Sequence, residues 1–267
     1  TGIFNRLGYN PFNVANDEIL GPDGQLNPNA EVIAQSLDWY DALSQQGKRE
    51  NYSLNISGGD ENYDLYFSTS YLDEEGYVIT SAFDRFTTRL NGNFTATDWL
   101  RMGGNMNIAM TSQEGPFSRG ASIANPFSFA KDMGSVYPVH LIDPETGEYI
   151  RDAGGDKQFD LGGGYPELGI TSRPTNPDRH AIAEALWNSD VRETNNLSSR
   201  YYAEFTILPE LKATVNYGID VNDYIRKEYE NHKVGDGAPS GRYSEDRFRR
   251  TVQNFNQILT YMESFGD

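Results

Sequence analysis

Apolar and polar residues alternate at every second position over several long stretches of this chain. Within residues 100–111, one side of the alternation carries Leu100, Met102, Met106, Ile108 and Met110. The same period recurs in residues 51–57, 63–71, 85–95, 196–207 and 211–222, and it is too irregular to assign faces in a seventh stretch, 249–265. Because successive side chains of a strand point to opposite faces, this pattern predicts antiparallel strands with one apolar and one polar face.

The connections between these stretches alternate in length. Tight links fall at residues 58–62, 96–98 and 209–210, whereas longer loops span 72–84, 113–191 and 233–247. Short turns on one rim and long loops on the other are typical of outer-membrane barrels. We therefore predict an all-β fold, an antiparallel transmembrane β-barrel segment of about seven strands with long extracellular loops. A soluble β-sandwich, whose half-buried strands also alternate, is the competing interpretation.

Two short helices are predicted inside the loops. Residues 177–187 form one, with Asn176 as its N-cap and Pro177 at the first helical position. The other is expected within residues 30–45.

The composition narrows the possible functions. The 267 residues include 39 acidic and 22 basic side chains, a formal charge of −17, which argues against nucleic acid as a partner. There is no cysteine, so disulfides and thiolate metal sites are excluded. A mean hydropathy of −0.65 argues against membrane-spanning helices but not against barrel strands, which hide their apolar residues at alternate positions. Neither terminus carries a targeting signal, and both ends read as cuts in a longer protein.

Four segments together resemble a known family. They are residues 38–41 (DWYD), 52–59 (YSLNISGG), 67–78 (FSTSYLDEEGYV) and 83–91 (FDRFTTRLN). In this order they are similar to the motifs of SusC/RagA-type TonB-dependent transporters of Bacteroidota outer membranes. The loop at 143–149 (DPETGEY) is similar to a recurring extracellular turn of that family. The resemblance covers most of the chain from about Trp39 onward, and the part from Tyr52 to Asn91 is the most specific.

The resemblance implies a partial chain of the barrel wall, without the plug domain, from a barrel of about 22 strands. It divides the chain into an extracellular loop region leading into the barrel (1–48), four barrel strands (49–112), a long extracellular loop with a short helix (113–191), and three barrel strands with a loop (192–267). The implied function is TonB-dependent import of glycans, peptides or similar nutrients across the Gram-negative outer membrane. The implied partners are a SusD-like surface lipoprotein, the remaining barrel and plug, TonB acting through the plug, and lipid with lipopolysaccharide.

Candidate ligand contacts come from aromatic residues of the long loop. Tyr137, Tyr149, Tyr165 and Trp187 either stack on sugar faces or pack the loop itself. Four arginines, Arg85, Arg89, Arg101 and Arg200, are expected to face the barrel lumen, where they pair with acidic groups of the plug or wall. Aromatic residues near strand ends form an expected interfacial girdle, although strand propensity explains them equally well: Tyr52, Tyr63, Tyr71, Phe86, Trp99, Tyr217 and Phe265.

Catalytic and metal-binding chemistry finds little support in the sequence. The three histidines, His140, His180 and His232, lie far apart, and the acidic run at 73–75 reads as a solvated turn. Residues 143–148 lack the ligand spacing of a calcium loop. We expect no enzyme activity, no cofactor and no metal site. The alternative functions are a secreted, soluble all-β module for carbohydrate binding or adhesion, and a glycoside hydrolase, for which no carboxylate pair is identified.

Overall fold

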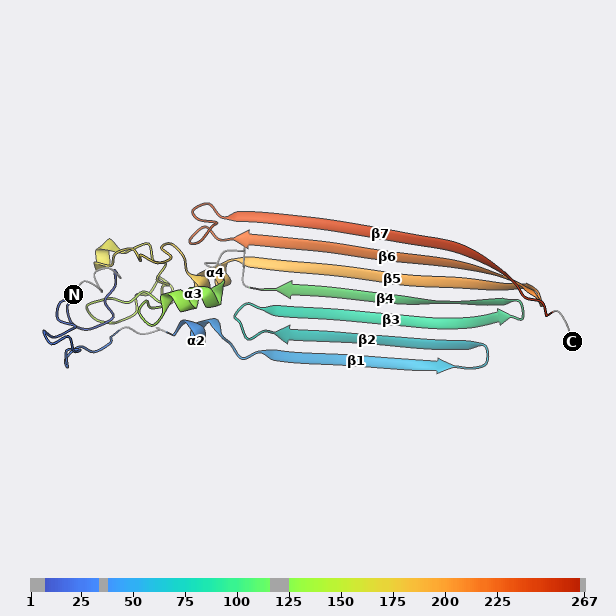
Figure 1. The fold of residues 1–267 in the computed structure, drawn as a ribbon, viewed down its shortest axis with the longest axis horizontal. Coiled ribbons are helices and arrows are strands. Elements are labelled where there is room, and N and C mark those ends of the chain that lie inside the picture. Colours follow the sequence, from blue (N-terminus) through green and yellow to red (C-terminus); the bar gives the residue numbers. More distant parts are fainter. Residues whose placement is uncertain (1–7, 34–37, 116–124, 265–267) are drawn as a thin grey trace.

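A single antiparallel sheet of seven strands dominates the molecule. In the computed structural model, the described residues are 8–33, 38–115 and 125–264. The strands are β1 (Lys48–Gly59), β2 (Tyr63–Glu75), β3 (Ala82–Thr97), β4 (Leu100–Glu114), β5 (Ser189–Leu208), β6 (Leu211–Glu230) and β7 (Arg242–Tyr261). They pair in sequence order, each antiparallel to the next (Figure 1). The described residues place no second sheet against this one, so the predicted segment of antiparallel barrel strands is confirmed and a sandwich is not.

The strands extend further than the alternation predicted. The β2–β3 loop shrinks from 72–84 to 76–81, because β2 runs to Glu75 and β3 begins at Ala82. The β6–β7 loop likewise covers 231–241, because β7 begins at Arg242 and not near 249. The added strand ends break the alternation, because Leu72 of β2 and Phe83 of β3 lie on the face that is otherwise polar, while the backbone hydrogen bonds of the ladder continue.

The register sorts the side chains into two faces. One row across the sheet joins Tyr52, Tyr71, Phe86 and Met110, which pair in turn across β1 to β4. This face is mostly apolar between that row and the short turns, and many of its large side chains are exposed, among them Leu90 at 37% and Leu259 at 69%. Of the expected girdle residues, Phe265 lies outside the described residues and the other six are exposed.

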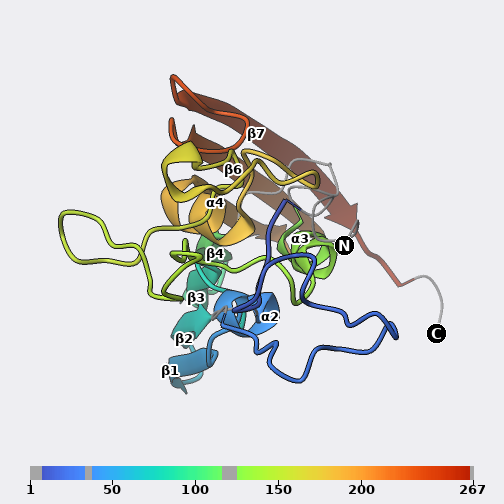
Figure 2. The same ribbon diagram turned by 90° about the vertical axis from the view of Figure 1, so that its left-hand side faces the viewer.

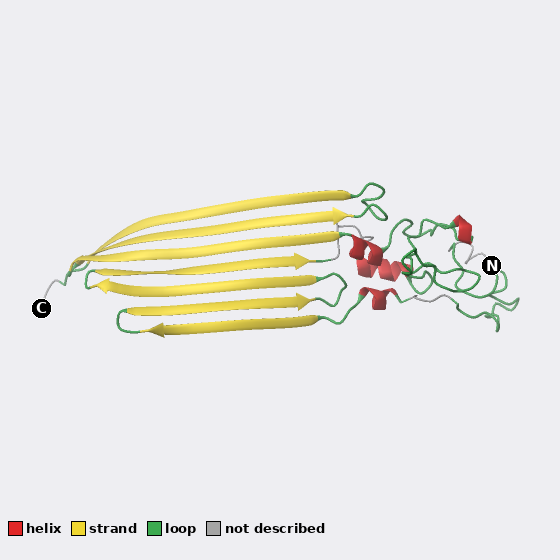
Figure 3. Ribbon diagram, turned by 180° about the vertical axis from the view of Figure 1, so that it is seen from behind, coloured by secondary structure: helices red, strands yellow, loops and turns green. Residues whose placement is uncertain are grey.

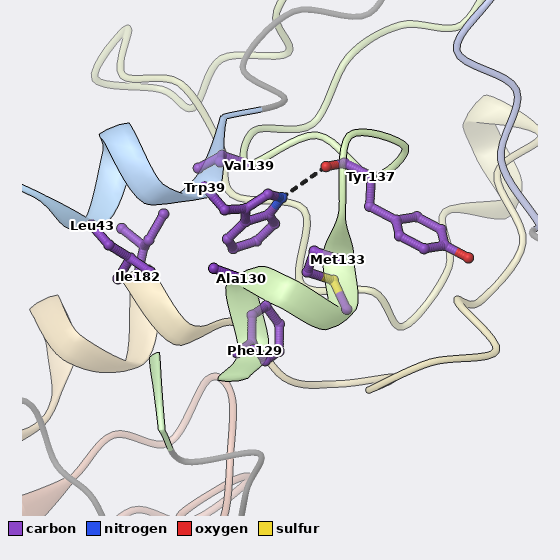
Figure 4. Packing of buried hydrophobic residues seen from close by; sticks show 8 residues of the cluster. All are labelled: Trp39, Leu43, Phe129, Ala130, Met133, Tyr137, Val139 and Ile182. Atoms are coloured by element: carbon purple, nitrogen blue, oxygen red, sulfur yellow. Dashed lines mark hydrogen bonds between the residues drawn. The ribbon is translucent and has the colours of Figure 1, made fainter. Parts of the chain in front are cut away.

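The hydrophobic core lies in the loops and not on the sheet. It is built from residues of three loop segments: Trp39, Leu43, Phe129, Ala130, Met133, Tyr137, Val139 and Ile182. Figure 4 shows Trp39 near Val139, Ala130 and Phe129, with its Nε1 donating to the Tyr137 carbonyl at 2.8 Å and the Tyr137 ring directed away from Trp39. We call the assembly of residues 8–33, 38–44, 125–188 and 231–241 the loop cap. It sits at one end of the strands and contains the α-helices of the described residues (Figures 2 and 3).

The helices of the cap are shorter than predicted. Helix α4 (Ala181–Trp187) begins four residues after Pro177, with His180 as its N-cap. The prediction of Asn176 as the cap was wrong because Asn176 and Asp178 have φ values of 50° and 56°, which no right-handed helix accepts. Among the described residues of the 30–45 segment, α2 (Trp39–Leu43) is the helical part, and Val32 instead pairs as a bridge with Phe12. Helix α3 (Pro126–Met133) and a 3₁₀ turn, η2 (Pro166–Leu168), were not predicted.

Candidate ligand-binding cleft and polar sheet face

Three loop segments of the cap converge on one cleft. The segment 139–160 folds back on itself through the bridges His140–Phe159 and Arg151–Lys157. Helix α4 ends there at Trp187, and the β6–β7 loop contributes Lys233. The cleft encloses about 730 Å³ and is lined by His140, Asp152, Asp156, Lys157, Gln158, Phe159, Leu161, Tyr165, Trp187 and Lys233. This volume is in the usual range of small-molecule sites, about 300–1,000 Å³.

Aromatic rings form a continuous chain along this cleft. Phe159 stacks on His140 with ring centroids 5.1 Å apart and planes 18° apart. It meets Trp187 edge-on at 5.6 Å, and His140 in turn meets Tyr149 edge-on at 5.9 Å. Edge-to-face and offset contacts at these distances are the favoured geometries of aromatic pairs, so the chain holds its shape without a ligand.

Two lysines place their ammonium groups over the outer rings of this chain. Lys157 Nζ lies 3.8 Å from the centroid of Tyr149, and Lys233 Nζ lies 4.7 Å from that of Trp187. Within the described part of the chain, neither ammonium lies within 4.0 Å of a carboxylate oxygen. The electron-rich ring faces attract these cations and orient them.

Of the two acidic side chains of the cleft, Asp152 is engaged in its own turn. Asp152 Oδ1 accepts hydrogen bonds from the backbone N–H groups of Gly154 and Asp156, at 2.9 and 3.0 Å. His140 next to them has a lowered pKa because burial disfavours its charged form and the nearby Lys157 repels a second positive charge. At neutral pH, His140 is therefore an uncharged ring, and the cations of the cleft are the two lysines.

A buried histidine anchors the wall of the cleft. The fully buried His180 accepts a hydrogen bond at Nδ1 from the Ala183 N–H and donates from Nε2 to the Val139 carbonyl at 2.8 Å. Burial lowers the pKa of His180 to about 3, so the ring is neutral and each nitrogen has the role its partner requires. The contact fixes the start of α4 to the segment that carries His140.

The structure separates the four predicted ligand aromatics. Tyr165 and Trp187 line the cleft, and Tyr149 adjoins it beneath Lys157. Tyr137 is only 3% exposed and belongs to the hydrophobic core cluster. The lysines were missed because only tertiary structure brings the long loop and the β6–β7 loop together.

The four predicted arginines lie on the polar face of the sheet. The register puts Arg89 opposite Asn107, Arg101 opposite Thr95 and Arg200 opposite Asn105, all on the face away from the exposed apolar side chains. Arg200 forms an ion pair with Asp220 at 2.7 Å, and its side chain lies across Gly218. In the described ranges, Arg85, Arg89 and Arg101 have no carboxylate oxygen within 4.0 Å.

Asparagines dominate the middle of that polar face. A hollow of about 590 Å³ is lined by six of them, Asn91, Asn93, Asn105, Asn216, Asn254 and Asn256. Tyr202 lies across Gly103 and donates its hydroxyl to Asn93 Oδ1 at 2.9 Å, and Asn93 in turn donates to Asp64. Hydrogen bonds between side chains thus cross from β2 to β5 on this face.

Among the described residues, no helix is long and apolar enough to cross a membrane. No three of their histidine or acidic side chains are close enough together to hold a metal ion.

Comparison with known proteins identifies relatives of one kind. No protein-family model matches the chain. TonB-dependent receptor P3 of Formosa agariphila is 24% identical over 240 residues, which are 86% of this chain and 21% of that protein. TonB-dependent receptor SusC of Bacteroides thetaiotaomicron is 25% identical over 71% of this chain and 18% of its own length. The solved RagAB peptide importer in its closed-closed state matches with a TM-score of 0.60 and 19% identity, over 87% of this chain and 24% of that one.

These findings confirm the resemblance to SusC/RagA-type TonB-dependent transporters that the motifs indicated. These curated relatives are named as TonB-dependent receptors, and they come from Formosa and Bacteroides. The antiparallel sheet matches part of the RagAB structure. The chain spans about a fifth of the length of these curated relatives.

Proposed function

We propose that this chain is a segment of the wall of a TonB-dependent importer in the outer membrane of a Bacteroidota-like bacterium. The observation that carries the proposal is the uncovered apolar face of the sheet. In β2 it runs from Tyr63 to Tyr71, nine residues, and transmembrane strands need about 9–11. Large apolar side chains on a face with no protein cover are stable against lipid and unstable against water.

The two edges of the sheet support a larger barrel. Among the described residues, β1 and β7 each pair on one side only, which leaves a row of backbone N–H and C=O groups on the other. Unpaired backbone groups in hydrocarbon cost several kcal/mol each, so strands in a membrane close into a barrel. Further strands beside β1 and β7 are therefore part of the proposal, and we place the total at about 22.

In that barrel the polar face lines the lumen, and the loop cap stands on the extracellular side. Arg85, Arg89 and Arg101 then face the space of the plug, which supplies carboxylates for them. The segments 1–48 and 113–191 are extracellular, and Tyr149, Tyr165 and Trp187 contact the incoming nutrient, a glycan or a peptide. A SusD-like lipoprotein, TonB acting through the plug, and lipid with lipopolysaccharide complete the proposed partners. This segment has no enzymatic role.

Membrane extraction of the full-length parent protein tests this proposal. We expect it to enter the membrane fraction, to require detergent for release, and to migrate differently on a gel before and after boiling, because a folded barrel resists the detergent of the gel. A freely soluble parent protein would exclude the proposal. Cooperative unfolding of these 267 residues alone in plain buffer would favour the alternative, a secreted carbohydrate-binding or adhesive module.

A further inference from the structure

We propose that the cleft between Lys157 and Lys233 is a subsite for a carboxylate group of the incoming ligand. The inference rests on the proposed function, because it names the chemistry that one part of the importer recognises. Two sources of a carboxylate fit this chemistry, a uronic acid sugar and an acidic peptide.

The first argument is that both ammonium groups lack an acidic partner. By contrast, two lysines of the sheet form ion pairs: Lys212 with Glu204 and Lys227 with Glu193, both at 3.1 Å. Within the described ranges, Lys157 and Lys233 instead meet aromatic rings. A ring holds an ammonium group without neutralising its charge, so the remaining N–H donors stay available to an anion.

The second argument is that the carboxylates lining the cleft form no ion pair with these lysines. Within the described residues, no oxygen of Asp152 or Asp156 lies within 4.0 Å of either ammonium nitrogen. Asp152 caps its own turn through the N–H groups of Gly154 and Asp156. Asp156 Oδ2 lies beside that turn, 4.0 Å from where a Cβ on Gly154 would stand. The histidine of the lining, His140, has a lowered pKa and is neutral at pH 7, so it neither competes with a bound carboxylate nor attracts one strongly.

The third argument concerns the net charge of −17, which by itself would repel an anion. At physiological salt, charges more than about 8 Å away are largely screened, so the charges that line the cleft outweigh the net charge of the chain there. Phe159 and Trp187 exclude water from one side of the cleft, which strengthens an ion pair formed there. The site is also preformed, because the aromatic chain and the His180 anchor hold its walls, and little ordering is needed on binding.

Paired probes that differ only in charge test the inference. The purified full-length transporter in detergent is titrated with hexagalacturonate and its methyl ester, and with a hexaglutamate peptide and its hexaglutamine equivalent. We expect at least one acidic probe to bind about tenfold more tightly than its neutral partner, and added salt to reduce the difference. The probe pair that shows the preference identifies the source of the carboxylate.

Matched lysine variants assign the preference to the cleft. The double variant Lys157→Met/Lys233→Met is expected to bind acidic and neutral probes equally, whereas Lys131→Met, an exposed lysine of α3 outside the cleft, keeps the preference. All three positions are exposed, and gel migration before and after boiling verifies folding. Equal binding of acidic and neutral probes by the unaltered protein, a preference that survives in the double variant, or no binding of either acidic probe would each overturn the inference. None of these outcomes affects the extraction test of the proposed function.

Discussion

Arginine substitutions along one strand measure whether the apolar face meets lipid. β4 offers the same residue at three depths of that face, Met102, Met106 and Met110. Met106 lies four residues from each of the others, which is about 14 Å along a strand and about 10 Å in depth at a tilt of about 40°. An arginine costs about 2–4 kcal/mol at the middle of a bilayer and about 0–1 near its borders. Met106→Arg should therefore destabilise the barrel by about 2–4 kcal/mol, and Met102→Arg and Met110→Arg by about 1 kcal/mol or less.

The assay is urea unfolding of the full-length transporter in phospholipid vesicles, with the folded fraction read from gel migration without boiling. Asn107 provides the matched control, because it lies beside Met106 on the polar face and opposite Arg89. Asn107→Asp should change stability by less than about 1 kcal/mol, since it sets a carboxylate against an arginine, while Met106→Asp destabilises. Equal costs at all three depths, or equal costs for Met106→Asp and Asn107→Asp, would refute the assignment of the two faces.

Three further predictions concern the cap and the polar face. His180 has a pKa of about 3 in the folded cap and 6.5 when unfolded, so its contribution is complete above pH 6.5 and falls by about 1.4 kcal/mol per pH unit below it. Hydrogen exchange in the cap should accelerate over that window, and His180→Asn should flatten the pH response. Arg226→Met should cost about 1–3 kcal/mol in urea unfolding, because it removes two hydrogen bonds from the buried Asp190, which keeps Arg192 as a partner, and Asp190→Asn in the same chain should restore part of the loss. In Gly103→Val the new Cβ would stand 2.7 Å from Tyr202, so a loss of about 1–3 kcal/mol is expected, and an unchanged thermal midpoint would contradict the packing described.

The alternation was a sufficient guide to the strands where one face is apolar and the other polar. Residues 63–71 and 100–111 follow it almost without exception, and both lie inside observed strands. It failed for β7, where Phe248 and Ile258 occupy the polar face while Gln253 and Gln257 occupy the apolar one. Pairing with β6 fixes the faces of that strand, and no pattern within the strand itself does so.

The residues of the candidate cleft could be predicted from the sequence only in part. The aromatic residues of the long loop were identifiable from their side chains, yet nothing local separates Tyr137, which is buried in the core, from Tyr165, which lines the cleft. Lys157 and Lys233 lie 76 positions apart in the sequence and meet only because the segment 139–160 and the β6–β7 loop fold against α4. Contacts between loops depend on how the loops pack, which has no periodic signature.

By itself, the sequence determined that this chain forms long antiparallel strands with one lipid-compatible face, joined by short turns and long loops. The physical reason is that successive side chains of a strand point to opposite faces. The alternation of apolar and polar residues along the sequence therefore predicts which side chains share a face. Only the tertiary structure decided where the core lies, which arginine has an acidic partner, and which loop residues share a cleft. Those properties depend on distances between residues far apart in the chain, and each of them follows from packing that no single segment specifies.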